Sequence, residues 1–212
     1  MLKCPLCLAK KSNAFHENAS RCYLRCDCCG LIFVSPDYHY SKHQEKCIYD
    51  QHENNPHDQG YRKHLNKLAL PLHGKLAPKS KGLDYGSGPG PTLSIMLSEL
   101  GHDMSIYDPI YADNKPVLAP DVPYDFISMT EVIEHIYNPH ADLAKLWGML
   151  KNGGYLAIMT GLSGNLKHFQ DWHYIKDPTH VCFYSIDTFR WLADSLGAEM
   201  FFPSDNVVLL KK

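Results

Sequence analysis

GLDYGSGPG, at residues 82–90, is the stretch that decides the fold. It follows a short apolar segment and precedes a helix that we expect to begin near Thr92. A glycine-rich turn in this position lets the backbone approach a ligand closely, and it aims the amides of a helix N-terminus at an anionic group. Because a glycine triplet alone is weak evidence, the interpretation depends on the residues around it.

Two acidic residues indicate a nucleotide-binding site at this turn. Asp84 ends the strand before the loop, and Asp108 ends the next strand, in the stretch MSIYD at residues 104–108. In nucleotide-binding α/β folds an acidic side chain at that second position accepts hydrogen bonds from both ribose hydroxyls. The separation of about 20 residues between the loop and Asp108 fits this rule. The alternative for Asp108 is an ordinary solvated strand end.

The sequence after Lys81 alternates short apolar runs with amphipathic stretches, which is typical of βαβ units in a parallel sheet. The last residues, with Pro203-Ser204-Asp205 between two apolar runs, predict a β-hairpin. We therefore predict an α/β domain over residues 81–212. Its strands are expected near 81–85, 103–108, 124–129 and 153–160, its helices near 91–100, 139–150 and 186–196, and its hairpin at 198–202 and 206–210.

The N-terminal segment is rich in cysteine, with six of the eight cysteines before residue 30. Its spacing, two Cys-x2-Cys pairs separated by 18 residues, is typical of a structural zinc site in which four thiolates hold a tetrahedral ion. We predict a zinc ribbon over residues 1–36, with Cys22 and Cys28 as non-ligands. The alternative, reduced core cysteines, needs a core that so short a segment lacks. The predicted ligands are Cys4, Cys7, Cys26 and Cys29.

Residues 37–80 are polar, and only residues 61–72 show helical spacing of apolar positions, so we predict a linker and a helix that leads into the domain. Hydrophobic residues make up 44% of the chain and charged residues 21%, which indicates a soluble globular protein. The net charge of -2 disfavours a nucleic-acid partner. Without a long apolar run or a signal peptide, we expect a cytoplasmic protein with no membrane partner.

Two motifs resemble those of a known superfamily. The pattern Asp84-x-Gly86-x-Gly88-x-Gly90 resembles the first motif of class I S-adenosylmethionine-dependent methyltransferases, rather than the Gly-x-Gly-x-x-Gly of dehydrogenases. YDFISMTEVIEHI, at residues 124–136, looks like the fourth-strand motif of the same superfamily. DPTHVCFYS, at residues 177–185, is similar to the segment after the fifth strand in bacterial members with an N-terminal ribbon. The nearest groups are small-molecule O-methyltransferases of quinone biosynthesis and sugar C-methyltransferases.

The resemblance runs from residue 82 to the end of the chain, and it implies a Rossmann-like methyltransferase sheet with an antiparallel last strand. It also implies that the 84–90 turn holds the methionine moiety, that Asp108 holds the ribose, and that Pro109-Ile110 forms part of the adenine wall. One departure is that only about 15 residues follow Asp108 before the next strand, which leaves little room for a third strand. The residues implied in cofactor binding are Asp84, Tyr85, Gly86, Ser87, Gly88, Gly90, Asp108, Pro109, Met129, Thr130 and Glu131.

Three histidines are candidates for a general base. Methyl transfer from a sulfonium needs an aligned acceptor, exclusion of water and, for an oxygen acceptor, removal of a proton. His135, His173 and His180 lie just beyond strand ends, where open α/β sheets place their ligands. His173 and His180 share a loop with aromatic residues that could close over an acceptor. His180 is equally suited to bracing that loop through a hydrogen bond.

Glu131, Glu134 and His135 have the spacing i, i+3, i+4, so a helix beginning there would put them on one face. Such a face could bind a divalent cation, as quinone-pathway methyltransferases are thought to do with these positions. The alternative, which we favour, is that the two carboxylates complement a helix N-terminus. We do not predict a second metal.

We expect a methyltransferase that acts on oxygen or carbon of a small-molecule acceptor. Met129-Thr130-Glu131-Val132 replaces the motif that base amino methyltransferases use, which argues against base N-methylation. One alternative is an RNA methyltransferase whose basic ribbon contacts RNA, and another is a non-catalytic protein that binds the cofactor or a partner. The basic residues of the ribbon are Lys3, Lys10, Lys11, Arg21 and Arg25.

Overall fold

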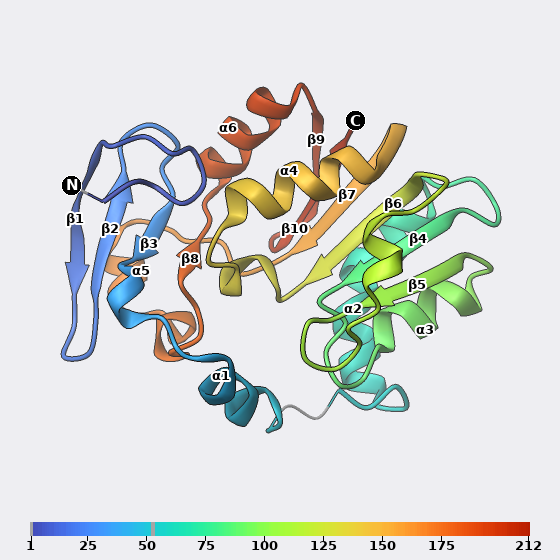
Figure 1. Cartoon of the computed structure of the whole chain (residues 1–212), viewed down its shortest axis with the longest axis horizontal. Coiled ribbons are helices and arrows are strands. Elements are labelled where there is room, and N and C mark those ends of the chain that lie inside the picture. The colour runs from blue at the N-terminus through green and yellow to red at the C-terminus, as the bar shows by residue number, and fades with distance from the viewer. Residues whose placement is uncertain (1, 52–53) are drawn as a thin grey trace.

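Two β-sheets organise the computed structural model, which describes residues 2–51 and 54–212 (Figure 1). The larger sheet has six strands in the order β5-β4-β6-β7-β10-β9. Strands β4 to β7 pair in parallel, whereas β10 pairs antiparallel with both β7 and β9. This confirms the predicted Rossmann-like sheet with an antiparallel last strand. The strands are β4 (Lys81–Tyr85), β5 (Asp103–Tyr107), β6 (Tyr124–Thr130), β7 (Leu150–Met159), β9 (Glu199–Ser204) and β10 (Val207–Lys211).

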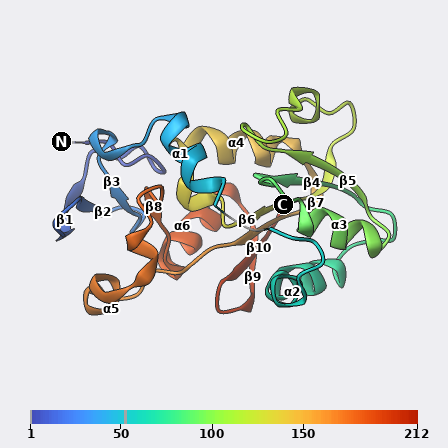
Figure 2. The same ribbon diagram turned by 90° about the horizontal axis from the view of Figure 1, so that it is seen from below.

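Helices cover both faces of this sheet because its central strands are apolar on both sides. Successive side chains of a strand point to opposite faces. In β7, Ala157 and Met159 therefore pack with α2 (Gln59–His73) and α3 (Thr92–Glu99), whereas Leu156 and Ile158 pack with α4 (Pro139–Met149) and α6 (Ile186–Leu196). Figure 2 shows α4 and the pair α2 and α3 on opposite sides of the strands. The helix expected at 61–72 is α2, which begins after the N-cap Asp58.

The region after β5 is as short as the sequence indicates. Asp108 and Ala112 form an isolated bridge, and a single 3-10 turn, η2 (Lys115–Leu118), leads to β6. Strand β5 therefore forms an edge of the large sheet. None of the described helices is both long enough and apolar enough for a membrane span.

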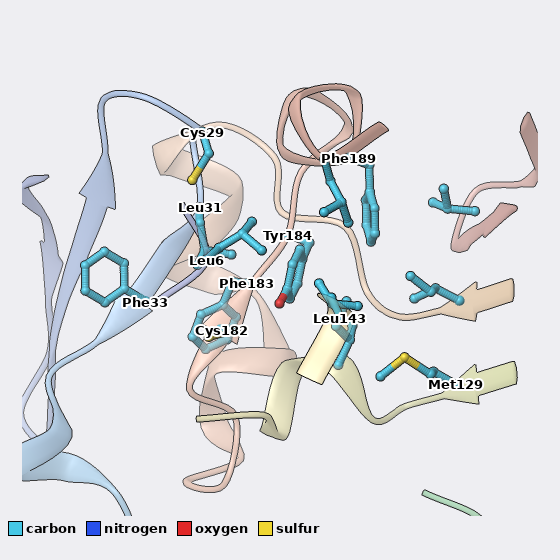
Figure 3. Close-up of a cluster of buried hydrophobic side chains, with 14 of the residues drawn as sticks. Leu6, Cys29, Leu31, Phe33, Met129, Leu143, Cys182, Phe183, Tyr184 and Phe189 are labelled. Atoms are coloured by element: carbon cyan, nitrogen blue, oxygen red, sulfur yellow. The ribbon is translucent and has the colours of Figure 1, made fainter. Parts of the chain in front are cut away.

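The small sheet joins the N-terminal ribbon to a strand from the second half of the chain. Strands β1 (Ser12–Glu17), β2 (Cys22–Cys26) and β3 (Ile32–Val34) pair antiparallel, and β8 (Cys182–Phe183), from the segment after β7, adds the fourth strand. Figure 3 shows the result: buried side chains run without interruption from Leu6 and Leu31 of the ribbon through Tyr184 to Leu143. The ribbon thus shares its core with the α/β domain.

The segment between ribbon and domain contains a helix that the sequence reading missed. Helix α1 (Lys42–Tyr49) follows the turn η1 (Pro36–Tyr38), and Ser41 and Gln44 form a capping box at its start. The spacing of Ser41 and Gln44 is the sequence signal that could have predicted it. Tyr137 holds this segment on the domain, because its hydroxyl oxygen lies 2.6 Å from the carboxylate of Glu45 and 2.9 Å from the carbonyl of Tyr40, within hydrogen-bond distance of both.

Phe183→Ala should strongly destabilise the protein. The Phe183 ring is fully buried among Tyr23, Phe169 and Trp172, so truncation removes apolar contacts and leaves a cavity. We expect a loss of about 3–5 kcal/mol in the free energy of unfolding, measured by urea denaturation. Phe202→Ala, at an exposed strand position, is the control and should change this free energy by less than about 1 kcal/mol. Equal losses in both variants would contradict the shared core.

Candidate functional site

The glycine loop between β4 and α3 packs closely against Val132, which follows β6, and against Asn54. Gly86 and Gly88 have φ of +79° and +65°, a conformation that glycine adopts without strain. A Cβ on Gly86 would lie 2.5 Å from a methyl carbon of Val132, so the loop packs directly on the residues that follow β6. Thr92 donates to the carbonyl oxygen of Asn54, which thereby lies against the loop. No sequence signal pointed to Asn54.

Asp84 lies buried at the centre of this region. It pairs in register with Ile106 of β5 and Ser128 of β6, and the Ser128 hydroxyl donates to its carboxylate at 2.8 Å. Burial raises the pKa of Asp84 to about 6, against the opposing effect of the Ser128 hydrogen bond. The next residue, Tyr85, stacks on Tyr107 with ring centroids 5.3 Å apart.

Asp108 ties the end of β5 to the glycine loop. One carboxylate oxygen accepts from the amide of Gly88 at 3.0 Å, and the other accepts from the amides of Ile110 and Tyr111 at 2.8 and 3.0 Å. An ionised carboxylate offers about four acceptor positions, so one remains for a ligand hydroxyl. Pro109 is exposed beside it.

Two of the predicted cofactor residues carry buried hydroxyl groups that could form hydrogen bonds with a ligand. The hydroxyls of Ser87 and Thr130 are buried and have no hydrogen-bond partner within the part of the chain that the structure describes. Buried polar groups without partners are costly, and a bound polar ligand relieves that cost. Met129 is fully buried in the core, so its main chain and not its side chain is the part suited to line the site.

The residues after β6 adopt an arrangement that the spacing did not predict. Glu131 has φ of +53°, and η3 (Ile133–His135) is a single 3-10 turn. We expected Glu131 and Glu134 to complement the N-terminus of an α-helix beginning here, and the structure has no α-helix over residues 131–135. Glu134 is instead fully buried, and its carboxylate accepts from the hydroxyls of Thr160, at 3.0 Å, and Tyr174. Burial, followed by the nearby charge of Glu131, raises the pKa of Glu134 well above its ordinary value.

Tyr174 connects this group of polar side chains. It lies in η4 (His173–Lys176), and its hydroxyl is within hydrogen-bond distance of Glu131, at 2.9 Å, and of Glu134. The amide of Gly161, just after β7, donates to the same hydroxyl at 3.1 Å. A hydroxyl has one proton to donate, so Tyr174 can donate to only one of the two carboxyl groups, and the other contact needs a proton on the carboxyl group itself. Sequence reasoning placed Tyr174 only in an aromatic loop.

The structure brings two of the three candidate histidines together. The rings of His135 and His180 lie 4.6 Å apart, and with Glu134 they offer three ligand atoms within 4.8 Å of one another. In His180, Nδ1 lies 2.7 Å from the carbonyl of Tyr174, and burial lowers the pKa of the ring. His173 is exposed and lines a separate hollow with Trp172.

The four predicted zinc ligands also converge. Sγ of Cys4 lies 3.5 Å from that of Cys29, and Sγ of Cys7 lies 3.4 Å from that of Cys26. All four sulfurs lie within 4.8 Å of one another. Zn–S bonds of about 2.3 Å in a tetrahedron place sulfurs about 3.8 Å apart, so the donor set fits a zinc ion with little movement.

A cavity of about 680 Å³ lies elsewhere, between the ribbon, residues 37–44 and residues 170–178. Arg21, Tyr38 and Trp172 are among its lining residues, whereas the predicted cofactor residues are not. The cofactor assignment therefore depends on the glycine loop and not on this cavity.

Asp84→Asn should flatten the pH dependence of stability. Because the pKa of Asp84 is raised from 3.8 to about 6, the folded protein holds this proton more tightly than the unfolded chain. The stabilisation is fully present below the unfolded pKa and is lost as the pH rises through about 6. The loss is on the order of 3 kcal/mol.

The free energy of unfolding of wild type and variant, measured by urea denaturation from pH 4 to 8, checks this expectation. Asp113→Asn, at an exposed position, is the matched control and should keep the wild-type profile. A wild-type profile as flat as that of Asp84→Asn would disprove the assignment.

The family model described as a methyltransferase domain matches residues 55–201. An S-adenosylmethionine-dependent methyltransferase from Archaeoglobus fulgidus aligns with a TM-score of 0.54 and 18% identity, over 73% of this chain and 95% of that chain. The magnesium protoporphyrin IX methyltransferase from Synechocystis PCC 6803, with bound SAH, aligns with a TM-score of 0.52 and 14% identity, over 82% and 95%. An O-methyltransferase family protein from Burkholderia thailandensis aligns with a TM-score of 0.51 and 11% identity, over 79% and 62%.

No curated protein matches the chain. At these identities the solved structures establish the fold, and the family model, which spans more than half of the chain, establishes the family. The chain belongs to the methyltransferase domain family, and it is an S-adenosylmethionine-dependent methyltransferase of class I.

Proposed function

We propose that this methyltransferase transfers the methyl group of S-adenosylmethionine to oxygen or carbon of a small-molecule acceptor. The observation that carries the proposal is the position of ionisable groups beside the glycine loop. Val132 packs on Gly86. The carboxylate of the preceding residue, Glu131, is hydrogen-bonded to the hydroxyl of Tyr174 and lies 3.9 Å from Nε2 of His64. Transfer to oxygen or carbon requires removal of a proton, and groups that can accept one are present there.

The cofactor residues have separable roles in this proposal. The cofactor supplies a methyl group on a positively charged sulfur. Asp84 and the backbone of the 86–90 loop bind its methionine end, Asp108 accepts from its ribose, and the hydroxyls of Ser87 and Thr130 gain the partners that they lack.

For an oxygen acceptor, His135 is the best placed of the three histidines to accept the proton. Nδ1 of His135 lies 3.2 Å from the carbonyl oxygen of Thr179, which can only accept, and 3.2 Å from the hydroxyl of Tyr49. A proton on Nδ1, donated to the Thr179 carbonyl, places the lone pair of the ring on Nε2. His180 is more deeply buried, with Nδ1 facing one carbonyl and Nε2 3.7 Å from Asp177, which suits a brace. His173 lies in the separate hollow.

The RNA alternative loses support from the ribbon itself. Arg21, one of its five basic residues, is buried and donates hydrogen bonds to carbonyl oxygens within the same chain. Fewer cations are therefore available for phosphate contacts, which set the affinity of non-specific RNA binding. We infer a structural Zn²⁺ in the ribbon, because four thiolates leave no open coordination position.

Calorimetric titration with S-adenosylmethionine and SAH tests the cofactor site. We expect micromolar binding, weakened at least tenfold, or about 1.4 kcal/mol, in Asp108→Ala, because this change frees the glycine loop and removes the ribose acceptor. Asp113→Ala, exposed in the same loop region, should bind like wild type. Folded, zinc-loaded protein that binds neither compound would disprove the site.

Cys26→Ser should abolish stoichiometric zinc binding, whereas Cys28→Ser, at an exposed position outside the cluster, should keep it. The reason is that three remaining thiolates form one Zn–S bond fewer and no longer complete the tetrahedral coordination of the ion. Elemental analysis of the purified proteins gives the zinc content. Equal zinc loss in both variants would contradict the ligand assignment.

A further inference from the structure

Arg21 occupies an unusual position for an arginine. It lies between β1 and β2, where its amide donates to the side chain of Asn18, and its side chain is almost completely buried. No carboxylate pairs with its guanidinium among residues 2–51 and 54–212. A buried cation needs other groups to offset its lost hydration.

Those groups are four backbone carbonyls of one loop in the α/β domain. Nη1 donates to the carbonyls of Pro178 at 3.1 Å and His180 at 2.9 Å. Nη2 donates to the carbonyls of Ile175 at 2.6 Å and Asp177 at 2.9 Å. The planar fork of the guanidinium spans all four acceptors at once, which a lysine ammonium with three donors cannot do.

Two further carbonyls of the same loop lie against the candidate histidines. The carbonyl of Thr179 lies 3.2 Å from Nδ1 of His135, and the carbonyl of Tyr174 lies 2.7 Å from Nδ1 of His180. Just after the loop, the amide of Val181 donates to the carbonyl of Glu134, and Val34 of the ribbon donates to the carbonyl of Val181. Ribbon, loop and strand ends are thus linked in one continuous series of hydrogen bonds.

We propose that Arg21 is a positioning residue through which the ribbon holds residues 174–180 against His135 and the Glu131–Glu134 pair. The ribbon then acts on the acceptor side of the site within its own chain. The part of this proposal that concerns His135 rests on the proposed function. Glu131 is the predicted cofactor residue that contacts this series, through Tyr174, whereas Asp84, Asp108 and the glycine loop are held by β4, β5 and β6.

Arg21→Gln tests the proposal, with Arg25→Gln as the matched control, since Arg25 is exposed on β2 of the same ribbon. Hydrogen–deuterium exchange should accelerate at least about tenfold in residues 172–184 of Arg21→Gln and stay unchanged in residues 82–92. The dissociation constant for SAH should stay within about twofold of wild type, with full zinc content. Arg25→Gln should match wild type in all three measurements.

The tautomer of His135 gives a readout that general destabilisation does not move. Nitrogen-15 spectra of labelled histidine, assigned with His135→Asn, should show a proton on Nδ1 of His135 in wild type and a mixed tautomer in Arg21→Gln. Arg21→Lys should restore the spectrum only in part. It also serves as the test variant if Arg21→Gln does not fold, and it should then show faster exchange in residues 172–184 with SAH binding kept.

Unchanged exchange in residues 172–184, or a uniform increase that also reaches residues 82–92 and abolishes SAH binding, would overturn the proposal. Absence of SAH binding in the wild type would contradict only the proposed function. Hydrogen exchange and the tautomer of His135 are both measured on the protein without cofactor, so they still test the role of Arg21.

Discussion

The parallel pairing of β4 with β5 and β6 is the constraint on which the site depends. Parallel strands end at the same edge of a sheet, so Asp84, Asp108 and Thr130 lie close together although the sequence separates them. The glycines after β4 then let the chain turn within contact of Val132. A side chain at Gly86 would push these two segments apart, and the amide of Gly88 could no longer reach Asp108 in the same way.

The polar cluster at the ends of β6 and β7 shows how a buried acid is tolerated. Glu134 has no access to solvent, so the hydroxyls of Thr160 and Tyr174 supply the hydrogen bonds that its carboxyl group would otherwise form with water. Each partner comes from a different segment of the chain, and removing one would leave a buried polar group unpaired. This requirement fixes the loop that carries Tyr174, and with it the positions of His180 and the carbonyl beside His135.

The ribbon depends on the domain as much as the domain depends on the ribbon. Its three strands are too few to enclose a core, and β8 and Tyr184 supply the missing apolar surface. The domain depends on the ribbon in turn, because Arg21 donates hydrogen bonds to four backbone carbonyls of residues 175–180. An N-terminal module that looks separable in the sequence is therefore part of the scaffold around the acceptor side.

The sequence by itself determined the sheet, the glycine loop and the four clustered cysteines. These features depend on local patterns: the alternation of apolar runs, the glycines that follow Asp84, and the spacing of Cys4, Cys7, Cys26 and Cys29. Only the tertiary structure decided that Arg21 binds the loop before β8, that Tyr174 joins Glu131 to Glu134, and that Asn54 lies on the glycine loop. The physical reason is that these contacts join residues tens of positions apart, and they are selected by the need to satisfy buried polar groups, which leaves no periodic trace in the sequence.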